Sequence, residues 1–107
     1  MVGLVMVTGK LSVEGSAALL AQGVTEREKQ FRSMVEAQGG QLRGYWYTDL
    51  GEAIVLIDLP DGYPRATAVL QSMASGAWSD VRMQELYGPQ DIDAGNADLP
   101  EYTPPGS

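Results

Sequence analysis

The 107-residue chain is predicted to form one α+β domain of the ferredoxin-like class, a four-stranded antiparallel sheet with helices on one face. The main observation is a pair of strand-like segments, 41–48 and 52–59, that are joined by a short turn at Gly51. A helix pattern flanks this pair on each side, and further strand patterns cover 2–8 and 77–87. With right-handed crossovers, the resulting order βα(α)ββαβ gives the ferredoxin-like sheet.

The first part of the chain predicts a central strand followed by helices. Residues 2–8 are rich in Val, Leu and Met without a charge, which is typical of a strand covered on both faces. Ser12 is placed as the N-cap of a short helix or turn, which Gly23 ends. Thr25 and Glu28 have the spacing of a capping box, so a second helix is expected to begin there.

Two helices are predicted from apolar residues at helical spacing. The first helix ends at Gly39 and Gly40, and its apolar stripe consists of Phe31, Met34, Val35 and Gln38. On its exposed side, Glu28 and Arg32 are expected to form an ion pair. In the second, which begins at Pro64 and ends at Gly76, the stripe consists of Ala66, Val69, Leu70 and Met73.

Alternation of side chains along a strand predicts which residues share a face. In 41–48 it places Arg43, Tyr45 and Tyr47 on one face, and Leu42, Gly44 and Trp46 on the other. In 77–87 it places Trp78 on the same face as Asp80 and Arg82, in a polar row that is typical of an edge strand.

The segments 2–8 and 53–57 are apolar on both faces, although helices can cover only one face of the sheet. The second face must therefore pack against another apolar surface, most simply the same face of a second copy. A chain of this length buries only about two-thirds of the surface that its unfolded form exposes, so pairing would also enlarge the core. The sequence thus predicts a homodimer.

The composition excludes several classes of function. A net charge of −7, with seven scattered Lys and Arg residues, argues against nucleic acid or an anionic membrane as a partner. The chain contains no Cys and no His, the usual ligands of zinc, haem and copper, so only oxygen-ligated hard cations remain possible. No residues are assigned to a metal site, and no cofactor is expected. Ser-His-Asp and Cys-His catalysis are excluded for the same reason.

No stretch approaches the ~20 apolar residues of a membrane span, and no basic residue precedes the first apolar stretch as in a signal peptide. The protein is therefore expected to be soluble and cytoplasmic. Residues 1–94 are assigned to the domain, and residues 95–107 to a flexible, acidic and Pro-rich tail with hardly any apolar residue.

Several short motifs, in order and spacing, resemble the GYD domain family over residues 1–94. They are Leu11-Ser12-x-Glu14-Gly15, the aromatic strand that ends at Gly51, Ile57-Asp58-Leu59-Pro60-Asp61 and Ala74-Ser75-Gly76-Ala77. The resemblance implies a dimeric α/β barrel, whose superfamily includes cofactor-independent monooxygenases, isomerases and haem-degrading enzymes. The chain reads Gly51-Glu52-Ala53-Ile54 where the family has Gly-x-Tyr-Asp, so a role of that acid does not transfer.

The aromatic residues of the strands are candidate walls of a ligand pocket, since they combine large contact area with a polar group. They are Tyr45, Trp46, Tyr47 and Trp78. Because neighbours in a strand point to opposite faces, Trp46 cannot line the same cavity as Tyr45 and Tyr47. The alternative is that all four fill the core and the dimer seam, where strands favour aromatic residues in any case.

Asp58 and Arg82 are the candidate catalytic residues. If Asp58 were buried at the end of its strand, its pKa would rise and suit it to act as a base. Arg82 would hold a carboxylate or enolate through its planar guanidinium. The alternatives are that Asp58 organises the turn that follows and that Arg82 forms a local ion pair on an exposed edge.

Three functions follow from these residues. The first is a homodimeric barrel that binds a small apolar or aromatic molecule between sheet and helices. The second is a cofactor-independent cyclase, isomerase or monooxygenase-like enzyme, in which Asp58 or a Tyr moves a proton and Arg82 stabilises negative charge. The third is a structural or regulatory dimer without a pocket. The first is the favoured hypothesis, and the other two are its alternatives.

Overall fold

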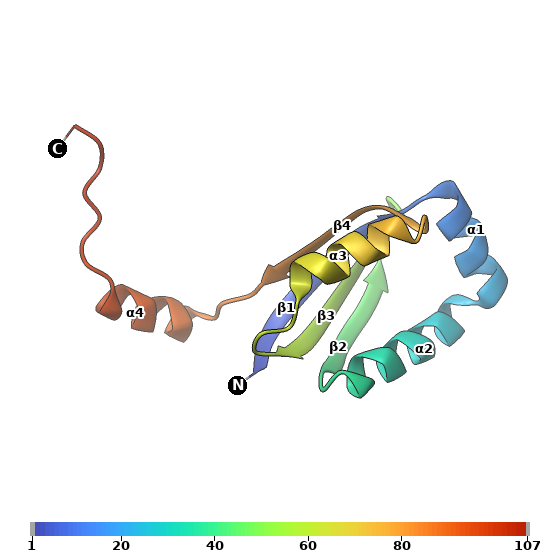
Figure 1. Cartoon of the computed structure of the whole chain (residues 1–107), viewed down its shortest axis with the longest axis horizontal. Coiled ribbons are helices and arrows are strands. Elements are labelled where there is room, and N and C mark those ends of the chain that lie inside the picture. The colour runs from blue at the N-terminus through green and yellow to red at the C-terminus, as the bar shows by residue number, and fades with distance from the viewer. Residues whose placement is uncertain (1, 107) are drawn as a thin grey trace.

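The computed structural model describes residues 2–106, in which four strands and four helices follow one another as β-α-α-β-β-α-β-α (Figure 1). The elements are β1 (Val2–Leu11), α1 (Val13–Gln22), α2 (Val24–Ala37), β2 (Gln41–Tyr47), β3 (Glu52–Pro60), α3 (Arg65–Ala74), β4 (Trp78–Glu85) and α4 (Pro89–Asp98). None of the helices in this part of the chain has the length and apolar character needed to cross a membrane.

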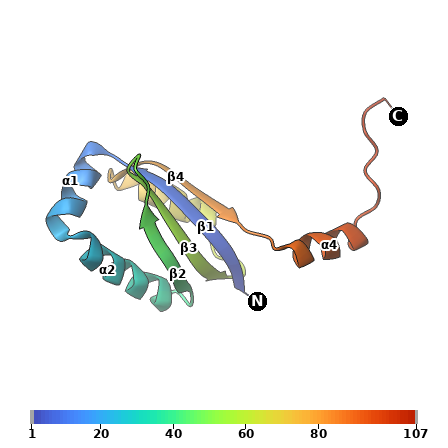
Figure 2. The same cartoon turned by 180° about the vertical axis from the view of Figure 1, so that it is seen from behind.

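The strands form one sheet in the order β2-β3-β1-β4, and all neighbouring strands are antiparallel. Helices α2 and α3 lie on one face of the sheet, called here the covered face, while Figure 2 shows the opposite, bare face. This arrangement confirms the predicted α+β class with its ferredoxin-like strand order. The two central strands, β1 and β3, are the two with the most apolar sequences.

The core lies between the covered face and α2. Alternate residues of β3 point into it, which gives that strand a strict alternation of buried and half-buried positions. The buried cluster consists of Val5, Val35, Leu42, Val55, Ile57 and Leu59. Full burial of such a side chain contributes roughly 1.5–3 kcal/mol, so this cluster stabilises the packing of α2 on the sheet.

The predicted N-cap at Ser12 is confirmed. Its Oγ accepts a hydrogen bond from the backbone N–H of Gly15 at 3.0 Å and donates one to the carbonyl oxygen of Gly76 at 2.6 Å. The cap therefore ties the start of α1 to the turn between α3 and β4. A Cβ at Gly15 would lie 2.0 Å from the carbonyl oxygen of Ala77, so the close approach of these two segments requires glycine.

The predicted capping box at Thr25 and Glu28 is wrong, because α2 begins at Val24 with Gly23 as its N-cap. Gly23 is the only residue between α1 and α2, and the chain changes direction there through a positive φ of 95°, which glycine adopts without strain. Thr25 is thus already inside the helix. The predicted pair of Glu28 with Arg32 is confirmed, with 3.3 Å between the carboxylate and the guanidinium.

A β-bulge in β2 overturns the predicted faces of that strand. Leu42 pairs with Ile57 and Gly44 with the adjacent Leu56, so Arg43 is an extra residue. Leu42 is consequently buried on the covered face, and Arg43 shares the bare face with Gly44. Uninterrupted alternation had placed Leu42 on the face of Gly44 and Trp46.

A second β-bulge, in β4, changes the face of the sheet on which Trp78 lies. Lys10 pairs with Asp80 and Leu11 with Trp78, so Ser79 is the extra residue of β4. Trp78 lies against Gly9 on the covered face, whereas Asp80 follows the ordinary alternation onto the bare face. The prediction that Trp78 shares a face with Asp80 and Arg82 is therefore wrong.

Helix α4 extends away from the sheet as an arm (Figure 1). The radius of gyration is 17.0 Å, against about 13 Å for a compact domain of this length. The sequence analysis predicted no helix here, and α4 crosses the predicted boundary between residues 94 and 95. Gly88 N–H donates to the carboxylate of Asp91 at 2.8 Å, and Pro89 occupies the first turn, two features that favour a helix start.

Candidate ligand-binding cavity

An apolar cavity of about 130 Å³ lies between the covered face and the helices. Its floor comes from β1, β3 and β4, through Val7, Val55 and Met83. Phe31 and Met34 of α2 lie on one side and Ser72 of α3 on the other. Tyr45 and Trp78, from the two edge strands, complete the lining.

The cavity exists because α2 and α3 contact different parts of the sheet. Helix α2 packs against β2 at one edge, and α3 packs against β4 at the other. Among the residues of α3, only the small Ser72 lines the central cavity. The middle of the covered face is therefore left without a large side chain above it.

Two further hollows adjoin this cavity. One, of about 200 Å³, lies beside α1 and is lined by Leu11, Leu19 and Tyr47. The other, of about 310 Å³, lies between α2 and α3 and extends to Tyr63. Arg27 and Trp78 line all three spaces, so the three hollows meet around these two side chains, and together they are called the groove.

Tyr45 and Tyr47 bring two hydroxyl groups to the β2 side of the groove. The hydroxyl oxygens of Tyr45 and Tyr47 lie 2.8 Å apart, and Phe31 packs edge-on against Tyr45 with 5.8 Å between ring centroids. Burial raises the pKa of Tyr47, the hydrogen bond to Tyr45 raises it further, and the positive charge of Arg27 offsets part of the rise. The Tyr47 hydroxyl therefore remains a neutral hydrogen-bonding group at neutral pH.

Arg27 is held in place by α2 itself. Its Nη1 donates to Oε1 of Gln30 at 3.0 Å, and its guanidinium carbon lies 5.9 Å from the centroid of the Phe31 ring. Oε1 of Gln30 also accepts from Nε2 of Gln22 at 2.9 Å, which ties the end of α1 to α2. The guanidinium is thus oriented without a carboxylate partner among residues 2–106.

Three of the four predicted ligand-binding residues lie at the groove. Tyr45 and Trp78 line the central cavity, and Tyr47 lines the neighbouring hollow. Trp46 points to the bare face, where 53% of its surface is exposed. This agrees with the expectation that Trp46 and the two tyrosines do not line one cavity.

No family model, curated protein or solved structure matches the chain. The resemblance to the GYD domain family therefore stays a prediction.

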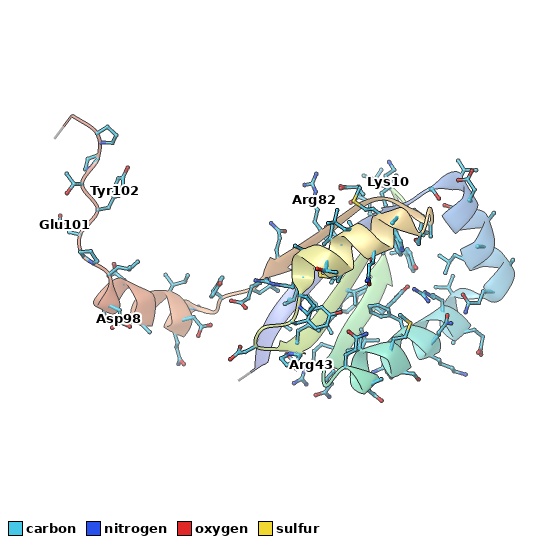
Figure 3. All side chains as sticks on the ribbon, in the orientation of Figure 1. Lys10, Arg43, Arg82, Asp98, Glu101 and Tyr102 are labelled. Atoms are coloured by element: carbon cyan, nitrogen blue, oxygen red, sulfur yellow. The ribbon has the colours of Figure 1, made fainter. Side chains whose placement is uncertain are left out.

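The structure does not bring Asp58 and Arg82 together. Asp58 pairs in register with Leu4 of β1, and Arg82 pairs with Thr8. Leu4 and Thr8 are four positions, or about 13 Å, apart along β1, and β3 and β4 lie on opposite sides of that strand. Both side chains lie on the bare face, where Asp58 forms an ion pair with Arg43. Figure 3 shows Arg43, the ion-pair partner of Asp58, and Arg82 at different ends of the sheet. Neither Asp58 nor Arg82 lines the groove.

Arg82 is paired locally, with 3.2 Å between its Nε and a carboxylate oxygen of Asp80. Both side chains are more than half exposed, so this pair contributes little to stability. The arrangement matches the alternative that the sequence analysis considered, a local ion pair on an exposed edge.

Sequence reasoning missed the importance of Arg27 for the groove. Phe31 and Met34 had been assigned to the apolar stripe of α2, and both line the cavity, while Phe31 also packs against the core. Arg27 is one helical turn before Phe31, at the i, i+4 spacing that places both on one side of a helix. That spacing was the available signal, although it does not by itself distinguish a site from a solvated surface.

Proposed function

We propose that the protein binds a small, largely apolar molecule in the groove between its sheet and helices α2 and α3. The observation that carries this proposal is the cavity above Val7 and Val55, whose lining is almost entirely apolar but includes Arg27 and Tyr45. The hydroxyl of Tyr47 extends this polar side through its contact with the Tyr45 hydroxyl. A concave apolar space with a few convergent polar groups is the usual form of a ligand site.

The dimensions favour a small ligand. The central cavity of about 130 Å³ is close to the size of an apolar cavity of ~150 Å³ that accommodates a benzene ring. The hollows next to it provide room for substituents on both sides of Trp78. The proposed ligand is therefore an aromatic or branched aliphatic compound with one or two rings.

The same proposal includes a homodimer formed through the bare face. The middle of this face carries apolar side chains that are only half-buried in one protomer, namely Leu4, Met6, Ile54 and Leu56, with Trp46 beside them. Charged residues flank them at both ends, through the pairs Arg43–Asp58 and Arg82–Asp80. An apolar centre with a polar rim is typical of a protein–protein interface, and a second copy supplies an identical apolar face.

A retained ligand tests the binding function most directly. Protein purified from its source and examined by native mass spectrometry is expected to carry a small molecule that denaturation releases. Ser72→Phe should fill the cavity and remove this molecule, because Ser72 faces the cavity from α3. Thr67→Phe is the matched control, since Thr67 is exposed on the same helix and lines none of the three hollows.

Sedimentation velocity tests the dimer. The wild-type protein should sediment as a dimer at micromolar concentration, and Leu56→Glu should give a folded monomer because it places a charge in the middle of the bare face. Thr67→Glu, on the other side of the sheet, should remain dimeric. A monomeric wild-type protein would contradict the proposed pairing while leaving the ligand site open to its own test.

A further inference from the structure

Arg27 differs from the other cationic side chains of the chain in its surroundings. Lys29, Arg32, Arg43 and Arg82 each form an ion pair with a carboxylate. Lys10 and Arg65 form no ion pair among residues 2–106, but both are exposed to water. Arg27 is partly buried and likewise has no carboxylate partner in that part of the chain. A partly desolvated guanidinium without a counter-charge attracts an anion from solution.

The groove contains no charge that could compensate Arg27. Of the residues between 2 and 106 that line the three hollows, Arg27 is the only charged one. The chain has 14 acidic residues, and none of them lines the groove. The single charge in this lining is therefore positive, although the protein as a whole carries a charge of −7.

The tyrosine pair adds a hydrogen-bond donor next to the cation. Tyr45 and Tyr47 share one hydroxyl hydrogen across their 2.8 Å contact, which leaves the other hydroxyl hydrogen free to donate. Since burial and the hydrogen bond to Tyr45 raise the pKa of Tyr47, the Tyr47 hydroxyl does not ionise and repel an anion at neutral pH. A guanidinium and a neutral hydroxyl are a suitable pair of groups for a carboxylate.

We propose that the ligand of the groove is an apolar monoanion, a carboxylate whose ring or branched chain occupies the cavity beside Trp78 while its two oxygens bind Arg27 and the Tyr45–Tyr47 hydroxyl pair. Because Arg27 is the single charge in the lining of the groove, it favours a ligand with one negative charge. This inference rests on the proposed function and specifies its ligand class. It assigns the binding of the anion to Arg27, whereas the sequence had suggested Arg82 for such a role.

Two probes of equal shape test the charge separately from the apolar body. 2-Naphthoate and 2-naphthamide are titrated into the full-length protein by isothermal calorimetry. The wild-type protein should bind the carboxylate more tightly. Arg27→Gln should weaken naphthoate binding by about tenfold or more, the loss expected for a charge-assisted hydrogen bond, and leave naphthamide binding unchanged. Lys29→Gln removes the same charge from an exposed position of the same helix and should change neither affinity.

The outcomes separate the two proposals. Equal binding of both probes, or an Arg27→Gln protein that still prefers naphthoate, would overturn the anion assignment and leave an apolar binding site. Failure of the wild-type protein to bind either probe would overturn the proposed function at this groove. If circular dichroism shows that Arg27→Gln is unfolded, Arg27→Lys replaces it. A lysine ammonium lacks the planar guanidinium that Gln30 and the Phe31 ring hold in place, so naphthoate affinity should fall while naphthamide affinity does not, and an unchanged ratio would contradict the assignment.

Discussion

The indole ring of Trp46 lies directly on Gly44, two residues earlier in β2, so closely that a Cβ at residue 44 would be 2.0 Å from its Cη2 atom. The glycine has no side chain to pack on the bare face, and the ring covers its backbone in place of one. This contact also fixes the position of the largest exposed apolar group on that face.

Gly44→Ala should displace the indole ring and lower the free energy of unfolding by about 1–3 kcal/mol, the usual cost of overpacking. Urea denaturation measures the change, and the tryptophan emission should shift as the ring moves. Trp46→Ala in the same chain should remove most of the additional cost, because the methyl group then has space. Equal costs of Gly44→Ala with and without Trp46 would show that the ring does not occupy this position.

The raised pKa of Tyr47 predicts a loss of stability in base. A tyrosine in the unfolded chain has a pKa of about 10, whereas burial and the hydrogen bond to Tyr45 raise the pKa of Tyr47 in the folded protein. Above pH 10 the unfolded state therefore releases a proton that the folded state keeps, and the free energy of unfolding falls as the pH rises. Denaturation series between pH 8 and pH 11 should show a shallower fall for Tyr47→Phe, and identical slopes would contradict the burial of this hydroxyl.

Gly9→Ala should disturb the wall of the cavity. A Cβ at Gly9 would lie 2.8 Å from two carbon atoms of the Trp78 ring, so the indole must move toward the space above Val7 and Val55. We expect weaker naphthoate binding together with a lower free energy of unfolding. Gly95→Ala is the matched control, because a Cβ at Gly95 in α4 meets nothing within 4 Å. Unchanged binding in Gly9→Ala would show that Trp78 does not form this wall.

Removal of residues 89–107 should leave the body of the protomer intact. Helix α4 has no buried residue, and Asp98, Glu101 and Tyr102 lie far from the sheet in Figure 3. The free energy of unfolding should change by less than about 0.5 kcal/mol, as for surface changes in general, while the hydrodynamic radius falls. A clearly larger loss would mean that the arm packs against a surface outside one protomer.

The sequence was sufficient for the class of the fold and for the order of the elements in the sheet and its two covering helices. Apolar runs without charge predicted the central strands, and the helical spacing of Phe31, Met34 and Val35 predicted the side of α2 that meets the sheet. The cap at Ser12 and the stop at Gly76 were also predicted correctly, because they depend on local chemistry. Helix α4 was missed since its composition, rich in Asp, Gly and Asn, indicates a loose segment.

Only the tertiary structure decided which side chains meet. The extra residues Arg43 and Ser79 shift the alternation within β2 and β4, and one such shift moves every side chain beyond it to the opposite face. The extra residue in β4 placed Trp78 at the cavity. The pairing of β3 and β4 with β1 placed Asp58 and Arg82 at separate positions on the bare face. Arg27 became the single charge of the groove because α2 and α3 pack against opposite edges of the sheet and leave its middle open. Local patterns encode helices and strands, but contacts between distant segments depend on how those elements pack together.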